Sequence, residues 1–428
     1  MATFVKDLRT SSFVLALACL LATVTTQPAL GQTFTVLHDF TGAGDGGNPY
    51  AGLTVDSDGN LYGTTSIGGV GYGIVFKMAH KESGWILTPL YTFRSGTDGA
   101  FPFGAVVLGP EGAVYGTTEY GGGGPCRSSD GFLGCGTVFK LNPPSTFCHT
   151  ASCPWTETVL YRFGFSPGDG TDPRSKLTFD GAGNLYGTTY EGGAGAGIVY
   201  EITRSDGGWT ETIVHTFKGN DGSSPNSEVI FDAAGNLYGT TTSGGNDCTG
   251  TGCGLVYELS RSGLGWTETV LYKFTGGDDG GNPYGGLIFG PADTLYGTTV
   301  YGGSNNNSGG TVFKLAPSRG GWELTTLYSL SGRLGSTASL VRDSSGNLYG
   351  TTIGDGSYQV GSVFKLVNSG GIWTFSDLHS FRSSDGGYLT GSVVFDAVGN
   401  LYGTTWDGGK FVCLAGGGGC GIVWEIAP

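Results

Sequence analysis

The residues that could do chemistry follow a repeated pentapeptide. Leu-Tyr-Gly-Thr-Thr, or a near copy of it, occurs seven times, and the two residues after each copy differ. Three of these pairs join an aromatic ring to a carboxylate, and a fourth supplies a ring alone. Aromatic faces stack on sugar rings and carboxylates accept hydrogen bonds from sugar hydroxyls, so this mixture suits a carbohydrate, with ordinary surface loops as the alternative. The predicted ligand-binding residues are Glu119, Tyr120, Tyr190, Glu191, Tyr301, Trp406 and Asp407.

Catalysis by the same carboxylates is the competing hypothesis. Glycoside hydrolysis needs two carboxyl groups about 5 to 10 Å apart, one of them with a raised pKa. The candidates are Glu119, Glu191 and Asp407. A lyase also needs a base and charge neutralisation, often from His, Tyr, Arg or a metal. His38, His215 and His379 stand where other copies have tyrosine, so we expect them to be structural. The sequence identifies no catalytic residue, and whether the protein is an enzyme stays open.

Acidic loops between the copies raise the question of a metal. Oxygen-rich, glycine-rich loops can bind Ca²⁺, which takes about six to eight oxygen ligands, but Asp and Gly are also ordinary turn residues. No segment matches the calcium-binding loop of a helix-loop-helix motif. We therefore expect turns and no metal or cofactor, with calcium as the alternative. The repeated aspartates are Asp45, Asp98, Asp169, Asp221, Asp279 and Asp385.

The repeat must build the scaffold that positions these residues. Each copy contains four short runs with strand character, bounded by Gly, Asp, Asn and Pro. In the fourth copy the runs are residues 228–232, 237–241, 254–259 and 266–274. A four-stranded unit of this size cannot bury both faces alone, so the copies must stack as an open solenoid or a closed ring. The tyrosines of the repeat are Tyr62, Tyr115, Tyr186, Tyr238, Tyr296, Tyr349 and Tyr402.

The chain ends predict a closed ring. Residues 32–40 align without gaps on residues 155–163, a fourth strand, whereas residues 421–426 are a third strand. The first strand can therefore complete the last blade and remove the exposed edges of an open stack. We predict an all-β, seven-bladed β-propeller with four antiparallel strands per blade, as a single domain over residues 32–428. In the alternative, each blade begins with its Trp-containing strand and no clasp exists.

The repeated motifs resemble those of a known family. Gly-Asn-Leu-Tyr-Gly-Thr-Thr, the Gly-Gly that follows it, the Val-Phe-Lys-Leu strand and the Asp-Gly-x-x-Pro connection are similar to the GloVer tandem-repeat proteins. That resemblance covers residues 32–428 and implies a secreted bacterial protein, often with a variable C-terminal anchor. It implies no particular activity. Because the sequence ends directly after its last strand, we expect release from the cell and not attachment to it.

The N-terminus predicts export. Lys6 and Arg9 precede the apolar run 13–24, and Ala29-Leu30-Gly31 precedes Gln32, which is the layout of a signal peptide over residues 1–31. The run is too short to span a membrane, and no second hydrophobic stretch follows. A lipoprotein that uses Cys19 is the alternative. We expect a secreted protein, extracellular or periplasmic, that is a monomer.

Eight cysteines follow the predicted signal peptide, and they occur as near neighbours. An even number with short spacing in an exported chain predicts four local disulfides. Zinc is the alternative, but no pair has the Cys-x-x-Cys spacing, and only His149 lies close to any of them. The predicted pairs are Cys126 with Cys135, Cys148 with Cys153, Cys248 with Cys253, and Cys413 with Cys420.

The charge excludes nucleic acid as a partner, because the net charge of −14 would repel a phosphate backbone. Extracellular polysaccharide or a cell-surface glycan is the partner that the variable residues favour. We predict a non-catalytic binding or surface-interaction propeller. The alternatives are a secreted glycoside hydrolase or polysaccharide lyase, and a purely structural matrix protein.

Overall fold

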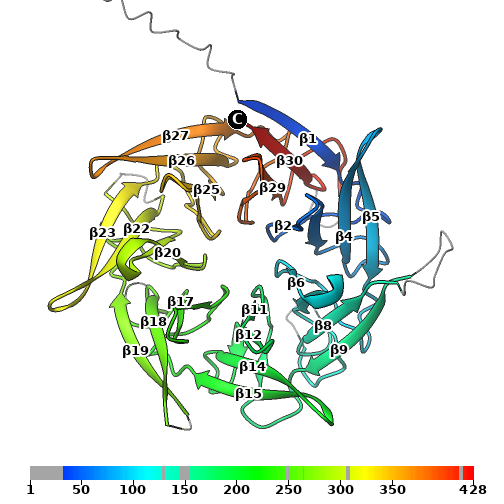
Figure 1. Cartoon of the computed structure of the whole chain (residues 1–428), viewed down its shortest axis with the longest axis horizontal. Helices are drawn as coiled ribbons and strands as arrows, with labels where there is room; N and C mark the ends of the chain where they lie inside the picture. The colour runs from blue at the N-terminus through cyan, green and yellow to red at the C-terminus, as the bar shows by residue number, and fades with distance from the viewer. Residues whose placement is uncertain are drawn as a thin grey trace, which may run out of the picture. The chain divides into compact units, whose positions relative to one another are not determined.

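The computed structural model describes residues 32–127, 131–144, 154–246, 248, 250–263, 265–304, 309–413 and 418–428. Within them, seven four-stranded antiparallel sheets stand as blades around an axis, so the predicted seven-bladed β-propeller is confirmed (Figure 1). The predicted signal peptide, Cys19, and the pair Cys148 and Cys153 with His149 lie outside these residues. No helix in the described ranges has the length and apolarity of a membrane-spanning segment.

The first strand of each blade lies nearest the axis and the fourth lies at the rim (Figure 1). Blade 1 contains β2 (Thr54–Val55), β3 (Leu61–Thr65), β4 (Ile74–Lys81) and β5 (Gly84–Thr92). Blade 2 contains β6 (Val107–Leu108), β7 (Val114–Thr118), β8 (Thr137–Asn142) and β9 (Thr156–Arg162). Blade 3 contains β11 (Thr178–Phe179), β12 (Leu185–Thr189), β14 (Ile198–Ser205) and β15 (Gly208–Thr216). Blade 4 contains β16 (Ile230–Phe231), β17 (Leu237–Thr241), β18 (Leu255–Ser262) and β19 (Gly265–Lys273).

The remaining blades repeat this order. Blade 5 contains β20 (Ile288–Phe289), β21 (Leu295–Thr298), β22 (Thr311–Ser318) and β23 (Gly321–Ser329). Blade 6 contains β24 (Val341–Arg342), β25 (Leu348–Thr352), β26 (Ser362–Ser369) and β27 (Ile372–Ser380). Blade 7 contains β28 (Val394–Phe395), β29 (Leu401–Thr405), β30 (Ile422–Ala427) and β1 (Thr33–Asp39). A small ribbon of β10 (Gly170–Thr171) and β13 (Glu191–Gly192) and two 3₁₀ turns, η1 (Pro110–Gly112) and η2 (Pro291–Asp293), complete the described elements.

The first strands are shorter than the sequence predicts. In blade 4 the strand covers Ile230–Phe231, whereas the predicted strand covered residues 228–232. The reason is that backbone carbonyls before it bond to the neighbouring blade. Ser227 O accepts from the hydroxyl of Thr188, and Val229 O accepts from that of Thr178. The segment before the strand is therefore held against the neighbouring blade.

Buried threonine hydroxyls join each blade to the next. The first threonine of every pentapeptide donates a hydrogen bond of 2.8 to 3.2 Å to a backbone carbonyl in the first segment of the following blade. Buried polar groups must be paired, so a hydroxyl here requires that carbonyl. The donor and acceptor pairs are Thr64 and Gly104, Thr117 and Ser175, Thr188 and Ser227, Thr240 and Gly285, Thr298 and Ala338, Thr351 and Gly391, and Thr404 and Ala51.

The N-terminal strand closes the ring, as predicted. Strand β1 pairs antiparallel with β30, from Thr33 opposite Ala427 to Asp39 opposite Ile422, and the two ends lie side by side in Figure 1. The ring of Phe34 also stacks on His379 of blade 6, with the ring centroids 3.7 Å apart. The alternative without a clasp is therefore excluded.

The hydrophobic core lies between the blades. At six seams, an aromatic side chain just after the fourth strand contacts an aromatic side chain of the next blade's third strand, with ring centroids 5.0 to 5.8 Å apart. Edge-on aromatic contacts of this kind add to the stabilisation from burial. The pairs are Phe40 and Phe76, Phe93 and Phe139, Phe163 and Tyr200, Phe217 and Tyr257, Phe274 and Phe313, and Phe381 and Trp424.

Three disulfides stabilise loops between second and third strands. They join Cys126 to Cys135, Cys248 to Cys253 and Cys413 to Cys420, with Cα atoms 5.0 to 5.6 Å apart. These are three of the four predicted pairs. Each closes a short loop, so it contributes less to global stability than a bridge between distant segments.

The repeated aspartates shape turns between blades. Asp98 accepts hydrogen bonds from the backbone amides of Arg94 and Gly96 and from the hydroxyl of Tyr91 on β5. Asp45 accepts in the same way, with His38 in the position of the tyrosine. The histidine that substitutes for tyrosine therefore keeps contact with the same aspartate.

At three of the seven seams, a glutamate of the next blade lies near the repeated aspartate. The three glutamates are Glu157, Glu211 and Glu268, each on a fourth strand. Burial raises the pKa of each of the three carboxyl groups to about 7, and the nearby aspartates Asp98, Asp169 and Asp221 add to the effect. The folded state thus holds a proton on these groups at a pH where an unfolded glutamate, with a pKa of about 4.3, has lost it.

We expect the seam glutamates to make stability fall as pH rises from about 4.5 to 7. Between the unfolded and folded pKa values the folded state binds more protons, so the free energy of unfolding decreases with pH. Glu157→Gln and Glu211→Gln should flatten this slope and raise the melting temperature at pH 8, with little effect at pH 4.5. Thermal unfolding of both variants across this range measures it. A slope equal to that of the parent protein would contradict the assignment.

Candidate functional site

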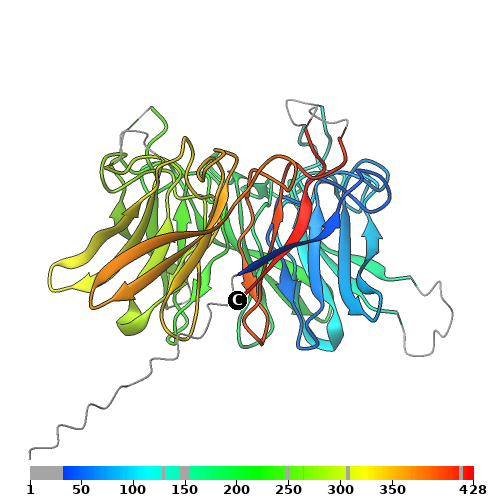
Figure 2. The same ribbon diagram turned by 90° about the horizontal axis from the view of Figure 1, so that it is seen from above.

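The second threonine of the pentapeptide holds the variable pair in place. Its hydroxyl donates to the backbone carbonyl two residues later, as in Thr118 to Tyr120 (3.0 Å) and Thr189 to Glu191 (2.8 Å). Isolated bridges join the loops to the interblade connections, for example Ala100 with Tyr120. Both sets of segments therefore lie on one face of the ring, and Figure 2 shows them along its upper edge.

The interblade connections turn toward the axis at a strained residue. In six blades the residue in this position has φ between 51° and 58° although it is not glycine, and in five of them it precedes proline. Proline favours extended backbone before it, and left-handed backbone costs roughly 1 to 2 kcal/mol per residue. Two backbone hydrogen bonds hold each one; Phe101, for example, donates to Tyr72 O and accepts from Glu119 N. The six residues are Asn48, Phe101, Asp172, Ser224, Asn282 and Tyr388.

This turn brings a second variable residue to the mouth of a central pocket of about 220 Å³. The residues there, one per blade, are Tyr50, Phe103, Arg174, Asn226, Tyr284, Thr337 and Thr390. Deeper in the pocket, Ser339 Oγ donates to Glu228 Oε1 across two blades at 2.9 Å. Lys176 also lines it. The pocket combines rings, both signs of charge and amide groups, which is the composition of a site for a polar ligand.

Glu119, Tyr190 and Arg174 form one cluster at the rim of this pocket. Arg174 Nη2 donates to Glu119 Oε1, and its guanidinium carbon lies 4.5 Å from the centroid of the Tyr190 ring. Only 5% of the Glu119 side chain is exposed. Burial raises the pKa of Glu119, and the charge of Arg174 opposes that rise. Burial and the charge of Glu119 raise the pKa of Asp172 to about 6.

A polar groove opens beside the cluster. It encloses about 700 Å³ and is lined by two predicted residues, Tyr190 and Glu191, and by Tyr284, which also lines the central pocket. Its other polar side chains are Asn220, Ser223, Ser224, Ser243, Asn246, Thr251 and Asn282. Glu191 is exposed, so its carboxylate is free of the burial that affects Glu119. Two tyrosines thus flank a groove of hydroxyl and amide groups.

Tyr120 belongs to the same cluster, because burial together with the charge of Glu119 and a hydrogen bond to Glu119 raises the pKa of Tyr120. Its ring is half-buried and stacks on Phe132, with ring centroids 5.9 Å apart. The remaining predicted residues lie in separate surroundings. Tyr301 is 47% exposed and lies near enough to Tyr284 to influence its pKa. Trp406 is 39% exposed and meets Tyr388 edge-on in blade 7. The carboxylate of Asp407 accepts hydrogen bonds from the backbone amides of Gly408 and Gly419 within its own loop.

Sequence reasoning missed Arg174, Tyr50 and Tyr284. A signal was present, because the proline of the Asp-Gly-x-x-Pro connection recurs while the next residue changes from tyrosine to phenylalanine, arginine and asparagine. The variation after that proline is as informative as the variation after Gly-Thr-Thr. Both positions converge only because the strained turn directs the chain inward.

The Gloeobacter/Verrucomicrobia repeat family matches the chain in three tandem regions, residues 22–152, 125–252 and 251–428. The chain therefore belongs to this family, which agrees with the resemblance seen in the motifs. No curated protein matches it.

Solved structures share the fold at low identity. The extracellular domain of a one-component system from B. thetaiotaomicron is 10% identical, with a TM-score of 0.55; the match covers 91% of this chain and 40% of that one. This chain thus spans less than half of that relative. PorZ, a surface component of the type-IX secretion system of Porphyromonas gingivalis, is 14% identical (TM-score 0.49, covering 83% and 45%). A carbohydrate-active enzyme of family AA12 from Trichoderma reesei is 11% identical (0.43, covering 93% and 96%). The likeness to the extracellular domain from B. thetaiotaomicron shows the fold alone.

We expect Arg174→Ala to destabilise the protein, because Glu119 would stay buried without its cation. Loss of a charged hydrogen bond costs about 1.5 to 3 kcal/mol, and Arg174 is partly exposed, so the lower end applies. The double variant Arg174→Ala with Glu119→Gln should recover part of the loss. Urea unfolding at pH 7 measures both. If Arg174→Ala unfolds at the urea concentration of the parent, the pair does not stabilise the fold.

Proposed function

We propose that this member of the Gloeobacter/Verrucomicrobia repeat family is an exported, non-catalytic propeller that binds an extracellular glycan in the groove beside its central pocket. The observation that carries the proposal is the pair Tyr190 and Tyr284, which flank a groove of serine, threonine and asparagine side chains. Aromatic rings supply apolar contact for sugar faces, and the polar groups satisfy hydroxyls. Three disulfides support an oxidising compartment.

Binding is favoured over hydrolysis because two of the three candidate carboxylates already have protein partners. Glu119 is paired with Arg174, and Asp407 accepts backbone amides of its own loop. A catalytic acid and base must be free to exchange protons with the substrate. Burial raises the pKa of Asp172 to about 6, which suits a catalytic acid better than the pKa of an ordinary carboxyl group. We therefore test hydrolysis on this residue.

The net charge narrows the ligand class. A protein with a net charge of −14 repels polyanions over a Debye length, so sulfated or uronate-rich polymers are disfavoured. Glu191 lies exposed in the groove and adds local negative charge. We therefore propose a neutral or amino-bearing polysaccharide as the ligand.

A panel of neutral, amino-bearing and acidic polysaccharides tests the proposal by calorimetry with residues 32–428. Tyr190→Ala and Tyr284→Ala should each lower affinity about tenfold, or ~1.4 kcal/mol. The matched control is Tyr358→Ala, because the Tyr358 ring, like that of Tyr190, lies 4.5 Å from the guanidinium carbon of an arginine, here Arg382, but Tyr358 lines neither the pocket nor the groove.

The outcomes separate the two functions. Absence of binding across the panel, or an equal loss in the Tyr358 variant, would contradict glycan recognition in the groove. If the protein releases new reducing ends from a polysaccharide and the Asp172→Asn variant does not, the function is hydrolysis and not binding alone.

A further inference from the structure

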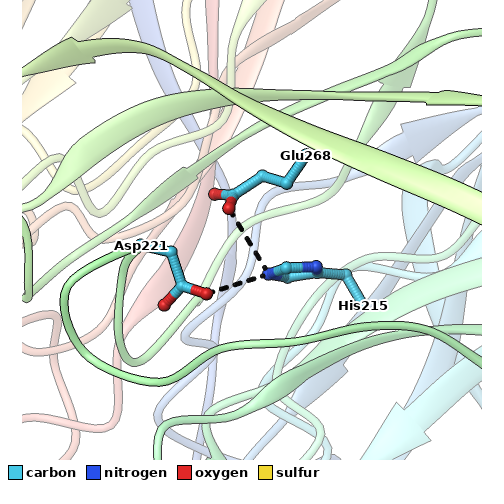
Figure 3. Close-up of side chains that lie close together, drawn as sticks. All are labelled: His215, Asp221 and Glu268. Carbon is cyan, nitrogen blue, oxygen red and sulfur yellow. Dashed lines mark ion pairs between the residues drawn. The ribbon is translucent and has the colours of Figure 1, made fainter.

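The seam between blades 3 and 4 places one imidazole against two carboxylates. His215 lies on β15, Asp221 in the connection that follows, and Glu268 on β19 of the next blade. His215 Nε2 is 3.5 Å from Asp221 Oδ2 and 3.7 Å from Glu268 Oε2, and Figure 3 shows it pointing between them. The exposed fraction is 17% for the His215 side chain, 25% for Asp221 and 12% for Glu268. Three ligand atoms of metal-binding type therefore face one small, mostly buried space.

The equivalent seam between blades 1 and 2 is closed by a hydroxyl. Tyr91 OH donates to Asp98 Oδ2 at 3.1 Å and contacts Glu157 Oε2 at 3.3 Å. A tyrosine hydroxyl donates its proton to a carboxylate, and it lies further from the backbone than the ring nitrogens of a histidine. The same position in blade 2 is Tyr161, whose hydroxyl donates to Asp169 at 3.1 Å, with Glu211 nearby. Histidine in place of tyrosine lacks this hydroxyl, and its nitrogen lies 3.5 and 3.7 Å from the two carboxylates.

At the His215 seam an imidazole takes the place of the hydroxyl. Besides its ion pairs with the two carboxylates, the buried His215 Nε2 has no hydrogen bond within the described part of the chain, whereas Oε1 of Glu268 is unpaired like Oε1 of Glu157 and Glu211 at the tyrosine seams. Asp221 Oδ1 accepts from the backbone amide of Lys218, which leaves Oδ2 directed at the imidazole. Buried polar groups are normally satisfied, so the imidazole nitrogen is the atom of this seam that calls for a ligand. Lys218 and Lys273 are the cationic side chains whose charges reach the cluster.

We propose that His215, Asp221 and Glu268 bind a divalent transition-metal ion, for which Zn²⁺ is the best match. Zinc bonds to histidine nitrogen and carboxylate oxygen at about 2.0 to 2.2 Å, which separates ligand atoms of a tetrahedral ion by roughly 3.4 Å. The separations of 3.5 and 3.7 Å fit this, and the carboxylate oxygens of Asp221 and Glu268, which lie within 4.8 Å of each other, would have to approach by at most about 1.4 Å. Calcium and magnesium prefer sites made only of oxygen, so the imidazole disfavours them. The fourth position is open to water.

This set of ligands occurs at one seam among the described residues. His38 with Asp45 faces a leucine, Leu87, in place of the glutamate, and His379 with Asp385 is covered by Phe34. The site joins two blades, so a bound ion would cross-link β15 to β19. It goes beyond glycan recognition and does not depend on it.

Zinc titration of chelator-treated residues 32–428 tests the site by calorimetry and thermal unfolding in a non-reducing buffer. We expect one ion per chain and a higher melting temperature with zinc. His215→Tyr should abolish both while the variant stays folded, because it recreates the hydroxyl-closed seam of blades 1 and 2. Glu268→Gln should weaken binding at least tenfold.

The control is His379→Tyr, which changes a seam histidine that has no glutamate partner and should bind zinc like the parent. Zinc binding that persists in His215→Tyr would overturn the proposal, as would a parent protein that binds no zinc at 100 μM, roughly the weakest affinity expected of a built site. A calcium or magnesium response equal to that of zinc would overturn the choice of metal.

Discussion

Seven buried threonine hydroxyls hold the ring together, because each donates a hydrogen bond to a backbone carbonyl of the next blade. A single blade cannot satisfy these hydroxyls or cover its aromatic face alone. Stacking therefore solves both problems at once, and the bond from Thr404 to Ala51 joins the last blade to the first. The pairing of β1 with β30 completes blade 7 itself from the two ends of the described chain.

The repeated residues build the scaffold, and the positions between them are free to vary. The second threonine fixes the loop after it through a backbone carbonyl, so the course of the loop backbone depends less on the side chains that follow. The strained turn before each proline does the same for the residue at the pocket mouth. Glu119, Arg174 and Tyr190 use this freedom at one place in the ring. The His215 seam shows that a single change at a repeated position can also create chemistry, because the neighbouring glutamate remains.

The sequence predicted the features that depend on repetition. The blade number, the ring closure and three described disulfides followed from repeated or paired residues. Among the residues singled out from the sequence, Glu119, Tyr120 and Tyr190 gather around Arg174, whereas Trp406 and Asp407 lie in another blade. Arg174 could not be placed, because its direction depends on the positive φ of Asp172, which an ordinary acidic residue does not reveal. The contact of His215 with Glu268 depends on how adjacent blades align, and no pattern within one repeat contains that information.

Unfolding of a single seam variant tests most directly whether these hydroxyls join the blades. Thr351 is suited to it, because its hydroxyl donates to Gly391 O and the side chain is fully buried. Thr351→Val keeps the shape and removes the donor, so the account predicts a loss of about 1 to 3 kcal/mol in urea unfolding, with a smaller loss for Thr351→Ser, which keeps the hydroxyl. A valine variant as stable as the parent would contradict the account.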